Sequence, residues 1–190
     1  METICIVGAG FMGAQIGLQC ALHGIPVCLT DAFEPSLDKA VQAQTTILSQ
    51  RVEAGEVSRA DQAAARARIH TTPDLCAAVD GVDLVIEAVP EQVDVKRQVW
   101  RELDRACPPH TILATNSSAI VSSRIADVTR RPDKVINLHF FNPALVMKLV
   151  EVVQGPHVAD ETTQISLDLC QQLDKVAVHV KKEVEGFLLN

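Results

Sequence analysis

Val7-Gly8-Ala9-Gly10-Phe11-Met12-Gly13 is the stretch that decides the fold of this 190-residue chain. It lies between a short apolar run, residues 4–7, and a run with helical spacing that begins at Phe11. In such a strand–turn–helix, Gly8 permits a tight turn, Gly10 lets a pyrophosphate approach the backbone, and Gly13 lets the helix pack closely on the sheet. The helix N-terminus adds N–H groups and partial positive charge. Taken alone, the spacing favours an ordinary glycine-rich turn.

Asp31 is the second feature that bears on whether the glycine loop binds a dinucleotide or is an ordinary turn. It follows Gly13 by 18 residues and closes a second apolar run, residues 27–29. A carboxylate at that place accepts hydrogen bonds from both ribose hydroxyls of an adenosine and repels a 2′-phosphate. By itself Asp31 could be a turn residue at a strand end. Together, the loop, helix, strand and acid predict dinucleotide binding, with NAD preferred over NADP.

The rest of the chain alternates apolar runs with longer helical patterns. Further strands are expected near residue 69 and over 84–86, 111–114, 135–138, 149–153 and 176–180. Helices are expected over 11–23, 35–53, 58–66, 93–106 and 160–173. Repeated β-then-α order predicts an α/β fold of the Rossmann type, a doubly wound and mostly parallel sheet covered on both faces.

Composition narrows the class of partner. The net charge is −7 and the 17 basic residues are scattered, which argues against nucleic acid or an anionic membrane as a partner. We expect no transmembrane span, no secretory signal and no clustered metal ligands. The six cysteines form no C-x-x-C pair, so we interpret them as reduced, buried residues of a cytoplasmic protein. They are Cys5, Cys20, Cys28, Cys76, Cys107 and Cys170.

A second group of polar residues lies in the later apolar runs. His139 ends the run that starts at Lys134, and Glu151 follows 12 residues later within another apolar segment. An acid in such a segment is costly unless paired, and a histidine is a natural partner. Oxidation of an alcohol requires a base for the hydroxyl proton, which a histidine oriented by a carboxylate can supply. Spacing alone leaves this pair and two unrelated strand-end residues equally favoured.

Asn116-Ser117-Ser118 follows the strand expected over 111–114, where an open α/β sheet places its ligand crevice. The hydroxyls there are candidates for binding a substrate oxygen. The residues alone favour the alternative, a helix cap.

Over essentially all of its length the sequence resembles the 3-hydroxyacyl-CoA dehydrogenases, including the 3-hydroxybutyryl-CoA enzymes. The resemblance rests on the glycine loop and on the segments 87–91, 115–118 and, above all, 139–143 running on to 147–151. It implies reversible oxidation of an (S)-3-hydroxyacyl-CoA to the 3-oxoacyl-CoA with reduction of NAD, in fatty-acid β-oxidation and related pathways.

The same resemblance assigns roles to individual residues. His139 would be the base, Glu151 its orienting partner, and Ser118, rather than Ser117, the active-site serine. Asn190 matches the substrate-site asparagine of the family. The cofactor site would be formed by Gly8, Gly10, Phe11, Met12, Gly13, Asp31, Glu91, Lys96 and Asn116.

The resemblance also divides the chain. Residues 1–185 form the NAD-binding domain, and residues 186–190 match the opening of a helical second domain. In the family that domain supplies much of the acyl pocket and the homodimer interface. The segment 46–49 does not match the expected CoA contact.

Two alternative functions remain open. The segment 182–187 resembles the L-gulonate dehydrogenases related to lambda-crystallin, so a sugar-acid or other hydroxy-acid dehydrogenase is one alternative. The segment 139–143 argues against it. A non-catalytic NAD-binding module is the other, and the intact set of Ser118, His139 and Glu151 argues against that.

Overall fold

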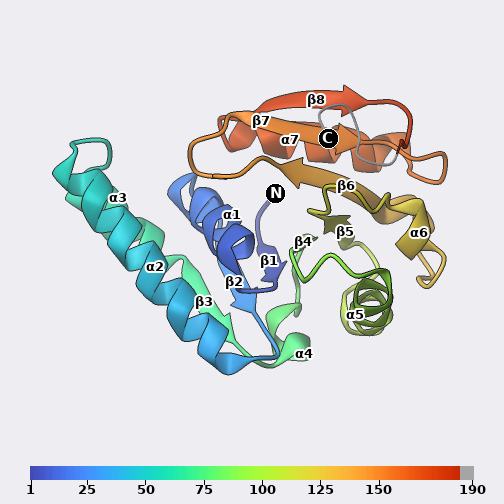
Figure 1. Cartoon of the computed structure of the whole chain (residues 1–190), viewed down its shortest axis with the longest axis horizontal. Helices are drawn as coiled ribbons and strands as arrows, with labels where there is room; N and C mark the ends of the chain where they lie inside the picture. Colours follow the sequence, from blue (N-terminus) through green and yellow to red (C-terminus); the bar gives the residue numbers. More distant parts are fainter. Residues whose placement is uncertain (185–190) are drawn as a thin grey trace.

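The computed structural model describes residues 1–184, which form one eight-stranded sheet with helices on both faces (Figure 1). The strand order is β3-β2-β1-β4-β5-β6-β7-β8, and every neighbouring pair is parallel except β6 and β7. The strands are β1 (Ile4–Val7), β2 (Val27–Thr30), β3 (Ile69–Thr72), β4 (Leu84–Glu87), β5 (Ile112–Thr115), β6 (Val135–Phe140), β7 (Leu149–Val153) and β8 (Val176–Val180). The predicted doubly wound, mostly parallel sheet is confirmed.

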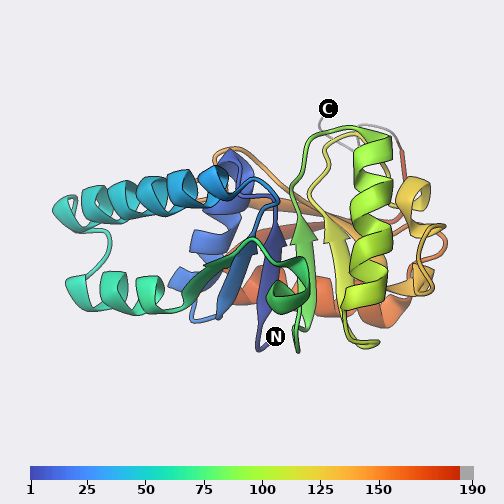
Figure 2. The same ribbon diagram turned by 90° about the horizontal axis from the view of Figure 1, so that it is seen from below.

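The helices separate into two layers because strand residues alternate between the faces of the sheet. Ile4 and Ile6 of β1 point to one face, which α1, α2 and α7 cover, whereas Cys5 and Val7 point to the other, which α4, α5 and α6 cover. Figure 2 shows α5 lying along the second face. The helices are α1 (Phe11–Leu22), α2 (Glu34–Glu53), α3 (Arg59–Ala67), α4 (Leu75–Ala78), α5 (Val93–Ala106), α6 (Ser123–Ala126) and α7 (Asp160–Gln172), with a 3-10 turn at Pro132–Lys134.

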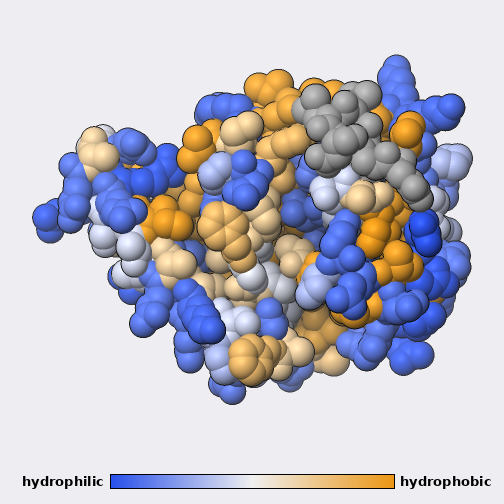
Figure 3. Space-filling view, in the orientation of Figure 1, coloured by the Kyte–Doolittle hydropathy of each residue, from blue (hydrophilic) through white to orange (hydrophobic). Residues whose placement is uncertain are grey.

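The helices α2 and α3 form an arm that extends beyond the sheet (Figure 1). Most of their residues are exposed, and Ser58 caps α3 by accepting a hydrogen bond from the Asp61 amide at 3.0 Å. In Figure 3 the arm is mostly hydrophilic, whereas apolar residues gather over the middle of the same face. The exposed side of the arm is therefore solvated, whereas Leu37 and Ala40 of α2 and Ala65 of α3 pack into the core.

Two details differ from the sequence prediction. The short helices α4 and α6 were not predicted, because four residues are too few to show a helical period. The strand β6 extends to Phe140, two residues beyond its expected end. No helix joins β6 to β7, so the strands can pair in antiparallel fashion through the loop 141–148.

The six cysteines are all unpaired. Burial raises the pKa of Cys20, Cys107 and Cys170 to about 12, which agrees with the prediction of inert, reduced thiols. The prediction was wrong for Cys76, which is exposed, and for Cys28, which is only half-buried. No helix within residues 1–184 combines the length and apolar character needed to cross a membrane.

The chain order reverses between β1 and β4: β2 and β3 lie on one side of β1, and β5 and β6 lie beyond β4. In open α/β sheets a ligand crevice forms beyond the carboxyl ends of the strands at such a switch point. The glycine loop follows β1 directly, and Ala88 follows β4. This edge of the sheet is therefore where the polar residues singled out by the sequence should meet.

Candidate active site

The glycine loop has the geometry that its spacing predicts. Gly8 has a φ of +103°, and a Cβ there would lie 2.7 Å from the carbonyl oxygen of Ala88. A Cβ on Gly13 would lie 1.9 Å from the carbonyl oxygen of Gly8, so α1 can approach the loop only with glycine at this place. A Cβ on Gly10 would meet no atom of the described chain within 4 Å. The loop is thus closed by contact at Gly8 and Gly13 and open at Gly10, as a pyrophosphate site requires.

Asp31 is fixed against this loop. Its Oδ2 accepts a hydrogen bond from the Ala9 amide at 2.8 Å, and its Oδ1 accepts one from the Phe33 amide at 2.9 Å. The carboxylate lines a cavity of about 630 Å³ together with Gly8 and Gly10. The opposite wall is largely apolar and includes Pro73, Leu75, Pro90, Val95 and Val99. An anchored carboxylate beside apolar walls fits the adenosine half of a dinucleotide.

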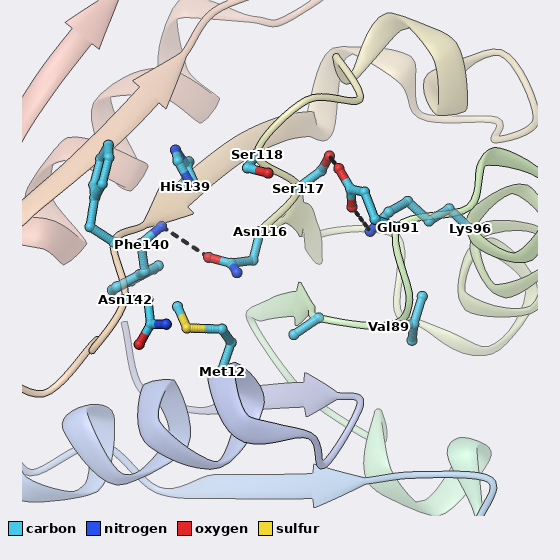
Figure 4. A pocket seen from close by; sticks show the side chains of 12 residues that line it. Met12, Val89, Glu91, Lys96, Asn116, Ser117, Ser118, His139, Phe140 and Asn142 are labelled. Carbon is cyan, nitrogen blue, oxygen red and sulfur yellow. Dashed lines mark hydrogen bonds and ion pairs between the residues drawn. The ribbon is translucent and has the colours of Figure 1, made fainter. Parts of the chain in front are cut away.

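A second cavity of about 460 Å³ shares Ala88 and Val89 with the first (Figure 4). Its other lining residues are Met12, Glu91, Lys96, Asn116, Ser117, Ser118, His139, Phe140, Phe141 and Asn142. Met12, Glu91, Lys96 and Asn116, which were expected at the cofactor site, therefore lie in one cavity with Ser118 and His139. Phe11 lies elsewhere: its side chain is 63% exposed and lines neither cavity.

His139 and Glu151 are paired. They are direct cross-strand partners in the antiparallel β6–β7 ladder, and His139 Nδ1 lies 2.8 Å from Glu151 Oε2. Both residues are buried, with 6% and 0% of their surface exposed. The ring of Phe141 packs against the imidazole, with 4.5 Å between ring centroids. Spacing alone left this pair undecided, the family resemblance predicted it, and the strand register brings its members together.

The two serines after β5 differ in their surroundings. The Ser117 hydroxyl donates to the Glu91 carboxylate and accepts a hydrogen bond from the Ile120 amide at 2.7 Å. It therefore stabilises a turn but does not cap a helix as the alternative predicted, because α6 begins at Ser123 with Ser122 as its N-cap. In Figure 4 the Ser118 side chain lies between Ser117 and His139 at the cavity wall. The structure thus separates a structural serine from one placed beside the histidine.

Asn116 ties two strand ends together. Its Oδ1 accepts a hydrogen bond from the Phe140 amide at 2.9 Å, which fixes the end of β6 beside the end of β5 (Figure 4). This contact holds the backbone next to His139. Asn190, the remaining predicted site residue, lies outside the described residues. Among residues 1–184 no group of histidine, cysteine and acidic side chains is arranged to hold a metal ion.

Sequence reasoning missed Glu87. Its carboxylate is fully buried, receives a hydrogen bond from the Thr115 hydroxyl at 2.8 Å and pairs with Lys96 Nζ at 2.7 Å. Lys96 also lies 3.3 Å from Glu91. Burial acts to raise the pKa of Glu91, but the hydrogen bond from Ser117 and the charge of Lys96 outweigh it, so this pKa is lowered. An acid that ends an apolar strand, with a lysine nine residues later, was the available signal.

Comparison with known proteins agrees with this geometry. The sequence profile of the family described as 3-hydroxyacyl-CoA dehydrogenase, NAD binding domain, matches residues 3–184. The chain is 36% identical over 187 residues to 3-hydroxybutyryl-CoA dehydrogenase of Clostridioides difficile, covering 98% of this chain and 66% of that protein. It is also 36% identical over 190 residues to a probable 3-hydroxybutyryl-CoA dehydrogenase of Bacillus subtilis, covering 100% and 66%.

Solved structures show the same similarity in three dimensions. The crystal structure of (S)-3-hydroxybutyryl-CoA dehydrogenase from Ralstonia eutropha superposes with a TM-score of 0.96 at 35% identity, covering 100% of this chain and 66% of that one. The 3-hydroxybutyryl-CoA dehydrogenase from Escherichia coli gives 0.91 at 37% identity, covering 94% and 38%. The chain therefore spans 66% of the length of the first two curated relatives.

Proposed function

The chain belongs to the 3-hydroxyacyl-CoA dehydrogenase family as an NAD-binding domain, and from this premise we propose that the protein reversibly oxidises (S)-3-hydroxyacyl-CoA thioesters to 3-oxoacyl-CoA. The observation that carries the proposal is the buried His139–Glu151 pair at the wall of the cavity next to the dinucleotide cleft. A base beside the nicotinamide end is what oxidation of a secondary alcohol needs.

His139 acts as the base in this proposal. Glu151 binds Nδ1, which fixes the orientation of the imidazole and offsets the positive charge it gains. We therefore assign proton transfer to the other ring nitrogen, Nε2. When bound, NAD supplies the acceptor for the hydride that leaves C3 of the substrate. His139 removes the hydroxyl proton as the ketone forms, and returns it when the reaction runs in reverse.

The remaining assignments concern binding. Ser118, beside His139, would donate a hydrogen bond to the substrate oxygen (Figure 4). Met12, Glu91, Lys96 and Asn116 would form the nicotinamide side of the site. Asp31 and the glycine loop would hold the adenosine and the pyrophosphate.

We also keep the domain division and the assembly as proposals. Residues 1–185 would be the NAD-binding domain and 186–190 the start of a helical domain corresponding to the remaining length of the relatives. That domain would contribute Asn190, much of the acyl pocket and a homodimer interface. The unpaired cysteines support a cytoplasmic location, which imaging of a tagged protein would test. Gene deletion followed by growth on fatty acids would test the role in β-oxidation.

A substrate panel tests the activity. The protein is assayed for NADH-dependent reduction of acetoacetyl-CoA, and for NAD reduction with (S)- and (R)-3-hydroxybutyryl-CoA and with L-gulonate. We expect turnover of acetoacetyl-CoA and of the (S)-thioester when the proposed helical domain is present, and poor turnover by residues 1–190 alone, because much of the acyl pocket would belong to that domain. Preference for L-gulonate would contradict the proposal and favour the sugar-acid alternative. NADH binding without turnover of any of these compounds would favour the non-catalytic module.

A further inference from the structure

A buried lysine lies against the loop that joins β6 to β7. Lys175 directly precedes β8 and is only 8% exposed. Its Nζ donates hydrogen bonds to the carbonyl oxygens of Ala144 at 2.6 Å and Met147 at 2.8 Å. Both carbonyls belong to the loop 141–148, which connects the strand that carries His139 to the strand that carries Glu151.

The position of this ammonium group is electrostatically costly. Burial lowers the pKa of Lys175, the charge of Lys148 lowers it further, and Asp174 opposes the change. Asp174 itself forms an ion pair with Lys148 at the surface. A buried cation is retained only where hydrogen bonds replace its hydration, and here the two loop carbonyls supply them. Lys175 therefore needs the two loop carbonyls in order to stay charged and buried, and the loop is held in place by the hydrogen bonds that Lys175 donates.

The backbone before Lys175 shows how the side chain reaches the loop. After α7 ends, Asp174 has a φ of +54°, a conformation uncommon for any residue other than glycine. The Lys175 amide then donates to the carbonyl of Cys170 at 2.8 Å. This tight turn brings Lys175 back towards the sheet and places it against the loop.

The loop in turn forms part of the site. Phe141 and Asn142, at its start, line the cavity that contains His139, and the Phe141 ring packs on the imidazole. In addition, Gln15 of α1 accepts a hydrogen bond from the Leu145 amide at 3.3 Å. The loop is thus held between α1 and the start of β8, and Lys175 supplies the charged anchor.

We infer that Lys175 is a positioning residue that clamps the loop 141–148. Through this loop it keeps Phe141 and Asn142 at the wall of the cavity that contains His139, where the nicotinamide would bind. The interpretation of this cavity as the nicotinamide site rests on the proposed function. The effect of Lys175 on the loop can be measured by hydrogen exchange without any turnover. Lys175 lines neither the cavity that contains His139 nor the cavity that contains Asp31. Its effect reaches the site only through the loop.

The test compares Lys175→Met, which removes the donors and keeps an unbranched side chain, with Lys39→Met as the matched control. Lys39 is an exposed lysine on α2, away from the loop 141–148. Hydrogen exchange of the loop amides, the Kd for NADH and steady-state kinetics are measured for each variant. Lys175→Arg serves as the conservative replacement, and Lys175→Gln replaces the Met variant if that variant fails to fold.

We expect loop exchange in Lys175→Met to accelerate and the Kd for NADH to rise, each by roughly tenfold, because hydrogen bonds to charged groups are lost. The KM for the cofactor should rise more than kcat falls. Lys39→Met should stay within about twofold of the parent, Lys175→Arg should restore part of the loss, and Lys175→Gln should be intermediate.

Unchanged loop exchange in both the Met and Gln variants would overturn the clamp. Faster exchange with an unaltered Kd and KM would overturn the positioning role. A protein that shows the clamp and binds NADH, but reduces no 3-oxoacyl-CoA, would contradict the proposed function and support the inference about Lys175.

Discussion

His139 and Glu151 face each other across the antiparallel pair of strands β6 and β7, with Nδ1 of the imidazole 2.8 Å from Oε2 of the carboxylate. Both are buried in the sheet next to the cavity wall. An antiparallel ladder places direct partners side by side, so this pair is held by backbone register rather than by flexible side chains. The predictions below follow from this pair, from the glycine loop and from the ion pairs that support the fold.

His139→Gln should lower kcat by roughly two to four orders of magnitude, the usual contribution of a general base. The Kd for NADH should stay within about twofold, because the adenosine cavity is untouched. Rapid-mixing kinetics and a fluorescence titration of NADH measure the two quantities. His179→Gln, on β8, is the control and should retain full activity. Near-parental turnover of the His139 variant would remove this residue from its role.

Glu151→Gln should lower kcat by about tenfold to a hundredfold, because an amide oxygen can still orient the imidazole but cannot offset its positive charge. The loss should be smaller than that of His139→Gln, and the double variant should be no worse than His139→Gln alone. Glu161→Gln, at an exposed position on α7, is the matched control. Additive losses in the double variant would show that the two side chains act independently.

Asp31 should set the choice of cofactor. The protein should bind NADH more tightly than NADPH, because a 2′-phosphate would lie against the carboxylate. Asp31→Asn should weaken NADH binding by about tenfold, since hydrogen bonds to a charged group are replaced by neutral ones. It should also narrow the difference in affinity between NADH and NADPH. Isothermal titration of both cofactors measures this. Equal affinities in the parent protein would exclude the assigned role.

Two glycine substitutions should separate binding from folding. Gly10→Ala should leave the Tm unchanged, because its Cβ meets no described atom within 4 Å, yet raise the Kd for NADH by about tenfold or more by occupying the phosphate space. Gly13→Ala should destabilise the fold by about 3 kcal/mol, the upper end of typical overpacking costs, because its Cβ would meet the Gly8 carbonyl oxygen at 1.9 Å. Thermal unfolding measures the change in stability of each variant, and NADH titration measures the change in its affinity for the cofactor.

Asp104 should contribute stability that depends on pH. Its carboxylate accepts hydrogen bonds from Arg130 at 2.8 Å and Arg131 at 3.0 Å. Burial acts to raise the pKa of Asp104, but these hydrogen bonds outweigh it and lower the pKa. Asp104→Asn should therefore cost about 3 kcal/mol at neutral pH.

A folded-state pKa below that of the unfolded chain means that this stability is complete above about pH 4 and is lost as the pH falls through the lowered value. The difference in unfolding free energy between the parent and Asp104→Asn should therefore shrink in acid. Denaturant titrations at a series of pH values measure it, with the exposed Asp38→Asn as control. A difference that stays constant into strong acid would contradict the assignment.

The sequence alone determined the features that depend on local spacing. The glycine loop, the alternation of strands and helices and the place of Asp31 follow from hydrophobic period, turn residues and distance along the chain. These signals lie within some 30 residues, so they can be interpreted without the path of the chain. They predicted the sheet and the dinucleotide cleft correctly. They missed α4 and α6, whose four residues carry no period.

Only the tertiary structure decided which polar residues meet. Spacing alone left His139 and Glu151 equally well explained as unrelated residues; the family resemblance predicted the pair, and the β6–β7 register brings its members together. The resemblance also chose Ser118 over Ser117, and the contact of Ser117 with Glu91, 26 positions away, gives Ser117 a structural role. The sequence gave no reason to notice Lys175, which reaches Ala144 across 31 positions. Such contacts depend on strand register and loop path, which packing of the whole core fixes and no local pattern records.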